Sequence, residues 1–148
     1  MKQQIVTYSL LLASVFTFQA CSSDDDSADT TKPTIVLNTP TEDQHFHPGE
    51  SIALNANFTD NLALGSYKIE VHHAGDGHTH KNANSAEWYY IHTATIEGNP
   101  NSYQATHLIE IPTLIEGDSI ELGHYHLGIY LIDAAGNEQQ QFIEIGID

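Results

Sequence analysis

Sulfur is almost absent from this sequence. Its 148 residues include one cysteine, Cys21, and one methionine, the initiating Met1. A single cysteine excludes an internal disulfide and a thiolate metal cluster. The folded part of the chain must therefore be stabilised by core packing alone. A metal site in it would have to use imidazole or carboxylate ligands.

Positive charge is also scarce. Four lysines and no arginine stand against 20 acidic residues. Lys2 lies in the export signal described below, so the mature chain keeps three basic residues against 20 acidic ones, a net charge of −17 with histidine neutral. The electrostatic field of this negative charge argues against nucleic acid and anionic lipid surfaces as partners. It attracts cations, metal ions included.

No apolar run in the sequence is long enough to span a membrane, for which about 20 residues are needed. The first twenty residues instead have the three parts of an export signal: Lys2 near the start, an apolar run over residues 5–18, and the small Ala20 before Cys21. The alternative is a short hydrophobic helix of the folded domain. It is disfavoured because the polar residues 22–26 follow directly and cannot pack.

This segment resembles the signal of a bacterial lipoprotein, in which the cysteine after a small residue is acylated and becomes the new N-terminus. Phe18 and Gln19 depart from the usual pattern, which has an aliphatic and a small residue there. The resemblance implies lipid on Cys21, and the polar residues 21–32 are expected to form a flexible tether. The serine and aspartate run also resembles the sorting signal of Bacteroidota lipoproteins, which implies the cell-surface side of the outer membrane.

From residue 33 onward, short runs rich in Ile, Val, Tyr, Leu and Thr alternate with Gly, Pro, Asn and Asp, without a useful amphipathic helical stretch. The pattern predicts one all-β domain over residues 33–148. Strand number and spacing favour an immunoglobulin-like antiparallel sandwich, with another sandwich topology as the alternative. The seven predicted strands cover residues 33–38, 51–59, 64–73, 87–96, 103–111, 119–132 and 138–147.

The predicted strand over residues 119–132 has the clearest alternation. Tyr125, Leu127 and Ile129 share one face, and a polar turn follows. This segment resembles the last hairpin of bacterial immunoglobulin-like domains, in which Tyr125 stands where such folds often place a corner tyrosine. The alternation puts His124 and His126 on the opposite, outer face of the sheet.

Histidine is the one residue type in clear excess, with ten copies. Three pairs have the spacing His-x-His, which in an extended chain points two imidazoles to one side. In an immunoglobulin-like sandwich, the end of strand 64–73, the loop after it and the start of strand 119–132 lie at one pole. We therefore predict a metal site formed by His72, His73, His78, His80, His124 and His126, with His45 and His47 as secondary candidates.

Within this set, His72, His124 and His126 face outward and form the expected triad, with His78 or His80 as a fourth ligand. Imidazole and carboxylate ligands favour zinc, with copper(II) or nickel(II) as alternatives, whereas copper(I) prefers sulfur. The alternative interpretation of the whole cluster is a solvated surface patch whose charge responds to pH.

Two further groups are less informative. His92 and His107 lie within predicted strands, where a structural role is commoner, so both are left outside the metal site. The aromatic residues Trp88, Tyr89 and Tyr90 are favoured as core residues, although an exposed ring among them could stack on a sugar.

Five motifs carry a resemblance to a known family. They are Phe46-His47-Pro48-Gly49, Phe58-Thr59-Asp60-Asn61, Tyr67-Lys68-Ile69-Glu70, Asp76-Gly77-His78-Thr79-His80 and Tyr125-His126-Leu127-Gly128-Ile129-Tyr130. Together they resemble the Bacteroidota lipoprotein family catalogued as domain of unknown function 4625, over residues 32–147. The family supplies no activity, so the functional prediction depends on the histidines.

The sequence supports three functional hypotheses. The first is a non-enzymatic surface lipoprotein that captures zinc, with an outer-membrane importer as a partner. The second is an adhesion module for a glycan or protein, with a pH-sensitive histidine surface. The third is a metal-dependent hydrolase with Glu70 or Asp76 as general base, which is disfavoured because no nucleophile or Ser-His-Asp pattern is present.

The lipid anchor makes a direct prediction. Changing Cys21 to Ala removes the only thiol that can be acylated, so the protein should move from the membrane fraction to a soluble fraction. Cell fractionation with immunodetection measures this distribution. A variant that still fractionates with membranes would show that the anchor lies elsewhere.

Overall fold

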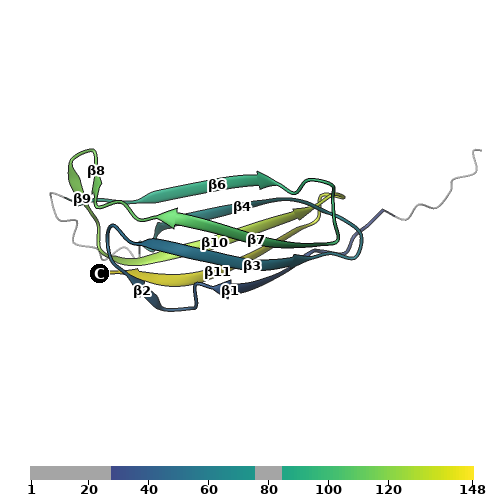
Figure 1. Ribbon diagram of the computed structural model, residues 1–148, viewed down its shortest axis with the longest axis horizontal. Coiled ribbons are helices and arrows are strands. Elements are labelled where there is room, and N and C mark those ends of the chain that lie inside the picture. Colours follow the sequence, from purple (N-terminus) through teal and green to yellow (C-terminus); the bar gives the residue numbers. More distant parts are fainter. Residues whose placement is uncertain (1–27, 76–84) are drawn as a thin grey trace, which may run out of the picture.

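A computed structural model describes residues 28–75 and 85–148 and consists of strands joined by turns (Figure 1). Residues 1–27 and 76–84, which include Cys21, His78 and His80, lie outside the described part. No helix capable of spanning a membrane occurs among the described residues. The strands are β1 (Thr34–Thr39), β2 (Gln44–Phe46), β3 (Ser51–Thr59), β4 (Leu64–His73), β5 (Ser85–Ala86), β6 (Tyr89–Thr95), β7 (Ser102–Glu110), β8 (Leu114–Ile115), β9 (Asp118–Ile120), β10 (Gly123–Asp133) and β11 (Glu138–Ile147).

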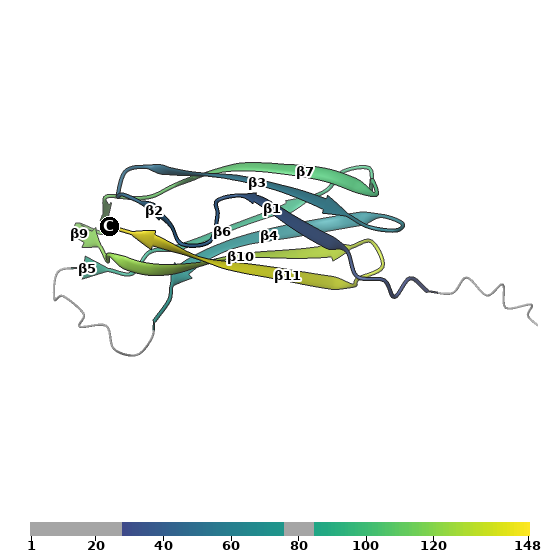
Figure 2. The same cartoon turned by 90° about the horizontal axis from the view of Figure 1, so that it is seen from below.

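Two sheets pack face to face, as the views in Figures 1 and 2 show. One sheet has the order β1-β3-β7, and the other has the order β2-β11-β10-β4-β6. A small third sheet, β5-β9-β8, lies at the end of the sandwich where the C-terminus also lies. The predicted all-β, immunoglobulin-like sandwich is confirmed.

The strand assignment differs from the sequence prediction, because β2, β5 and β8 are short strands outside the seven predicted ranges and one predicted strand is divided. The predicted strand 119–132 is two strands, β9 and β10, because the chain turns between them and Gly123 has a φ of 132°, which favours glycine. The pairing of β6 also differs from that of the fourth strand in a constant-type immunoglobulin domain, which pairs with the fifth. Here β6 pairs with β4 and forms the edge of the five-stranded sheet.

The core is formed by alternate residues of both sheets. On β10, Tyr125, Leu127 and Ile129 are fully buried, and β10 pairs with β4 on one side and β11 on the other. The three-stranded sheet contributes large side chains such as Ile52 and Phe58. Burying one such side chain stabilises the fold by about 1.5–3 kcal/mol, so a core of this kind can hold the domain without a disulfide.

Tyr125 is the corner tyrosine that the sequence predicted. Its hydroxyl donates a hydrogen bond to the backbone oxygen of Glu121, four residues upstream, at 2.6 Å. Burial raises the pKa of Tyr125 to about 12, so the hydroxyl keeps its proton at neutral pH and can donate. The bond fixes the turn that leads from β9 into β10.

The corner hydrogen bond can be tested by changing Tyr125 to Phe. The substitution keeps the buried ring but leaves the Glu121 oxygen without its donor, so the free energy of unfolding should fall by about 1–3 kcal/mol. Urea unfolding followed by the fluorescence of Trp88 measures the change. The control is Tyr89→Phe. Tyr89 is 58% exposed, so the stability of this variant should stay within about 0.5 kcal/mol of wild type. Equal stability of both variants would contradict the role of the corner.

Candidate functional site

The outer face of the five-stranded sheet carries the histidines of β4 and β10. His126 lies directly opposite His72 of β4 on one side and Glu144 of β11 on the other. His124 lies two residues before His126, so it shares the same face. Tyr125 between them is fully buried, which confirms that His124 and His126 point away from the core.

The imidazoles of this face lie close to one another and to carboxylates. The rings of His72 and His126 are 5.4 Å apart and meet edge to face at 87°. Nδ1 of His124 lies 2.7 Å from Oε1 of Glu144, and Nε2 of His72 lies 3.9 Å from Oε1 of Glu70. We call His72, His124 and His126 with Glu70 and Glu144 the histidine face.

His45 joins the edge of the histidine face, whereas His47 lies at its end. The ring of His45 lies over Gly146, where an added Cβ would come within 2.5 Å of Nδ1. Gly146 in turn pairs with His124. His45 Nδ1 lies 2.6 Å from Oδ2 of Asp148, and His47 Nδ1 lies 2.9 Å from the Asp148 backbone oxygen. The contact with the Asp148 backbone oxygen, and then the charge of Glu50, raise the pKa of His47.

His73 faces the other side of the sheet from His72. Its ring meets the edge of the buried Tyr125 ring at 5.1 Å, and its Nε2 is buried without a hydrogen-bond partner among the described residues. The structure therefore does not bring His73 together with the histidine face, because neighbouring residues of a strand point to opposite sides. His78 and His80, the predicted ligands from the loop, lie outside the described residues.

The residues of the histidine face do not have three ligand atoms mutually within 4.8 Å. Among the described residues, the one group with three ligand atoms mutually within 4.8 Å is Asp29, Asp60 and Asp133, at the other end of β10. The side chain of His124 is 66% exposed and that of His72 is 38% exposed, so both have rotamers open to them. A metal ion would bind to this face only after these side chains rotate.

A second pair of histidines, which the sequence left outside the site, lies between the edge strands of the two sheets. His92 of β6 and His107 of β7 stack with ring centroids 3.9 Å apart and an angle of 21°. The hydroxyl of Tyr90 contacts Nε2 of His107. Burial, and then the neighbouring His92, lower the pKa of His107. The alternation of β6 and β7 was the signal that could have predicted their inward direction.

The aromatic block divides between core and surface. Trp88 is only 5% exposed and packs 5.8 Å from the ring of Tyr125, as favoured from the sequence. Tyr90 points inward and contacts His107. Tyr89 is exposed and pairs with His72, at the edge of the histidine face.

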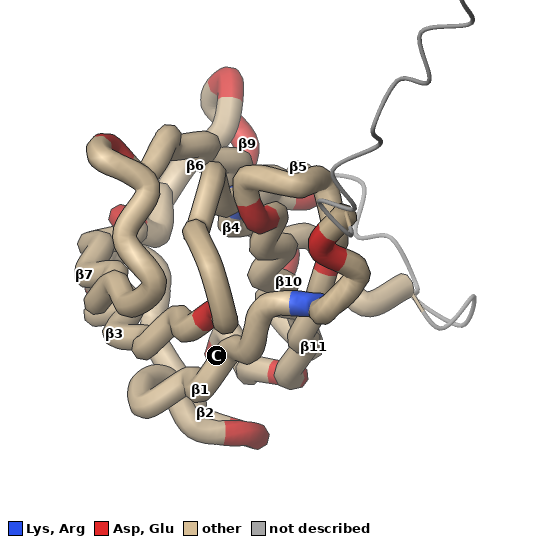
Figure 3. Tube along the Cα trace, turned by 90° about the vertical axis from the view of Figure 1, so that its right-hand side faces the viewer, with Lys and Arg blue, Asp and Glu red and all other residues tan. Residues whose placement is uncertain are grey.

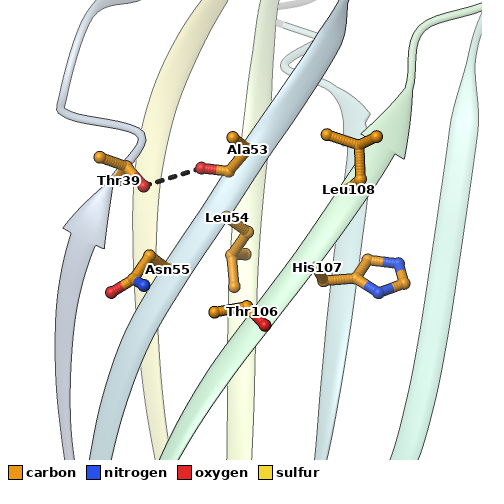
Figure 4. A pocket seen from close by; sticks show the side chains of 7 residues that line it. All are labelled: Thr39, Ala53, Leu54, Asn55, Thr106, His107 and Leu108. Atoms are coloured by element: carbon orange, nitrogen blue, oxygen red, sulfur yellow. Dashed lines mark hydrogen bonds between the residues drawn. The ribbon is translucent and has the colours of Figure 1, made fainter.

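A shallow cavity of about 380 Å³ lies on the three-stranded sheet (Figure 4). Its lining is Thr39, Ala53, Leu54, Asn55, Thr106, His107 and Leu108. The Thr39 hydroxyl donates to the Ala53 backbone oxygen at 2.7 Å, and Figure 4 shows the His107 ring directed away from Thr39. The lining has no carboxylate, and its one imidazole is engaged with Tyr90. This cavity offers no set of metal ligands.

The fold and the histidine face define the protein as an all-β sandwich domain that carries a cluster of imidazoles on one sheet. The chain belongs to the family described as a domain of unknown function (DUF4625), which matches residues 19–148. The family resemblance of the sequence motifs is thereby confirmed. No curated protein matches the chain.

Solved structures resemble the domain at low sequence identity. Fibronectin(III)-like modules of Clostridium thermocellum CbhA have a TM-score of 0.41 and 15% identity, over 77% of this chain and 94% of that chain. Spo0M, a sporulation control protein from Bacillus subtilis, has a TM-score of 0.42 and 12% identity, over 79% and 49%. A beta-glucosidase from Listeria innocua has a TM-score of 0.41 and 10% identity, over 77% of this chain and 16% of that chain.

The histidine stack predicts a pH dependence. A lowered pKa means that folded His107 takes up a proton at lower pH than the unfolded chain does, so stability from this group is lost as pH falls below about 6.5. We expect the imidazole of His107 to titrate below 6.5 in NMR spectra, and His92→Gln to raise its pKa. The control is the same titration in denaturant, where His107 should titrate near its ordinary value. A folded-state pKa at or above the denatured value would contradict the stack.

Proposed function

We propose that this protein is an exported lipoprotein, anchored through Cys21, that binds a divalent transition metal on the histidine face. Zinc is the first candidate, with copper(II) or nickel(II) as alternatives. The observation that supports this proposal best is the direct pairing of His72 with His126 on neighbouring strands, with rings 5.4 Å apart. The role that fits is metal capture at the cell surface, with delivery to an outer-membrane importer.

Paired strands bring two imidazoles within reach of one ion. Residues directly opposite on antiparallel strands have Cβ atoms about 5 Å apart. Two nitrogens bound to one tetrahedral zinc ion at about 2.0–2.1 Å lie roughly 3.3 Å from each other. Rotation of the side chains of His72 and His126 can therefore bring a nitrogen of each to a shared ion. His124, which lies two residues before His126 on the same face of β10, is the third ligand.

The carboxylates of the histidine face have a supporting role in this proposal. Metal-bound histidines commonly hold the other ring nitrogen against a carboxylate, which fixes the ring and makes it a stronger ligand. The 2.7 Å contact between Nδ1 of His124 and Glu144 is of this type and leaves Nε2 of His124 for the metal. Glu70 is the corresponding carboxylate beside His72, and it also accepts a hydrogen bond from Lys68 at 2.6 Å.

The proposed site predicts a loss of zinc affinity on substitution. The double variant His124→Ala, His126→Ala removes two ligands but leaves the buried face of β10 intact, so affinity should fall by about a hundredfold, ~2.8 kcal/mol. Isothermal titration of zinc into protein purified without a histidine tag measures the change. Binding should also weaken below about pH 6, where imidazoles hold protons in place of metal.

The matched control is the double variant His45→Ala, His47→Ala, which removes two exposed histidines from the edge and end of the same sheet. Its zinc affinity should fall much less than that of the β10 variant. The proposal is wrong if wild type does not bind zinc, or if both double variants bind it as tightly as wild type does.

An adhesion module is the second candidate, and one feature of the same sheet favours it. Phe142 is 48% exposed, and its ring lies over Gly128, where an added Cβ would come within 2.6 Å of it. Tyr130 packs edge to face against Phe142 at 5.5 Å, and the ammonium of Lys68 lies 3.7 Å from the Tyr130 ring centroid. Exposed aromatic rings of this kind can stack on a sugar or a protein side chain. Metal content of the purified protein distinguishes the two candidates.

A further inference from the structure

Three carboxylates gather at the end of the sandwich opposite the start of β10. Asp60 follows β3, Asp133 ends β10, and Asp29 lies in the segment before β1. One oxygen of each lies within 4.8 Å of the other two. Figure 3 looks at this end, where acidic positions lie close to the beginning of the described part of the chain. We call these three residues the aspartate cluster.

The surrounding backbone holds each aspartate in place. Oδ2 of Asp60 accepts hydrogen bonds from the backbone N–H groups of Leu62 and Ala63, both at 2.8 Å. Asn137 donates to both carboxylate oxygens of Asp133, from its backbone at 2.8 Å and from its amide at 2.7 Å. The carboxylates are therefore positioned by the turns after β3 and β10, which bring together segments distant in sequence.

Asp29 is bound to the same turns from the N-terminal side. Its carboxylate accepts hydrogen bonds from the backbone N–H of Thr31 at 3.0 Å and from the Asn61 amide at 3.1 Å, and these bonds lower the pKa of Asp29. The Asn137 amide also donates to the backbone oxygen of Asp29 at 3.0 Å. Backbone and amide donors thus hold all three carboxylates in place.

One carboxylate oxygen of the cluster has no hydrogen-bond partner among the described residues. Oδ1 of Asp60 is buried and makes no hydrogen bond within residues 28–75 and 85–148, and Asp133 is only 4% exposed. No ion pair joins the three carboxylates to a lysine or histidine within residues 28–75 and 85–148. A buried acceptor without a partner costs about 1–3 kcal/mol, and like charges this close repel. A cation would remove both costs.

We propose that the aspartate cluster is a calcium site. Calcium takes six to eight oxygen ligands at about 2.3–2.6 Å, so oxygens on opposite sides of one ion are up to roughly 5 Å apart, in keeping with the spacing of the cluster. Three carboxylates, with backbone or amide oxygens and water, match that preference. Zinc prefers nitrogen and sulfur, and magnesium demands a tighter octahedron.

Calcium at this position would fix the segment that precedes β1 to the end of the sandwich, because Asp29 comes from that segment and the other two ligands come from the domain. The site would therefore set how the domain is held relative to the chain that leads to Cys21. This proposal is independent of the histidine face, which lies at the other end of β10.

The test is thermal unfolding and isothermal titration of the purified protein after removal of metals with a chelator. Calcium at about 2 mM should raise the melting temperature of wild type by several degrees, whereas equal magnesium, or sodium chloride of matched ionic strength, should not. Asp60→Asn and Asp29→Asn should each weaken calcium binding by about tenfold or more. The second variant lies outside the sandwich strands and decides the matter if the first fails to fold.

The matched control is Asp118→Asn, an exposed aspartate of β9 at the other end of the molecule, which should keep wild-type calcium affinity. The variant His124→Ala, His126→Ala should also bind calcium as wild type does, so failure of the zinc proposal and failure of the calcium proposal are separate results. The proposal is overturned if calcium neither binds to nor stabilises wild type, or if Asp29→Asn and Asp118→Asn respond to calcium alike.

Discussion

The alternation of side chains along β10 is the constraint on which the rest of the structure depends. β10 pairs with β4 and β11 along nearly its whole length, so its register places every second residue in the core. Tyr125, Leu127 and Ile129 are fully buried as a result. The same register leaves His124 and His126 on the outer face. A shift of one residue would bury the imidazoles and expose the core, at a cost of several large apolar side chains.

The two ends of β10 have different ligand chemistry. Its start carries imidazoles from adjacent strands with carboxylates behind them, a set suited to zinc, copper(II) or nickel(II). Its end carries carboxylate oxygens held by backbone and amide donors, a set suited to calcium. The two ends are about 30 Å apart at the ordinary rise of a strand, so ions bound there would not compete for ligands.

The edges of the sandwich are covered without a disulfide. β6 and β7 are edge strands of different sheets, and the stacked rings of His92 and His107 with the Tyr90 hydroxyl fill the space between them. At the other edge, the short β2 pairs in parallel with β11 and shortens its exposed edge. One edge is thus covered by polar aromatic side chains and the other by backbone pairing.

The sequence by itself determined the sandwich class, the longer strands and the direction of His72, His124 and His126, because strand formation and side-chain direction both follow from a period of two. The same alternation already implied that His73 faces away from His72. The tertiary structure alone decided that β6 pairs with β4, that His92 stacks on His107, and that Asp29, Asp60 and Asp133 meet. Turn signals mark where a chain reverses, but the partner of an edge strand and the meeting of three distant turns depend on packing between segments far apart in sequence.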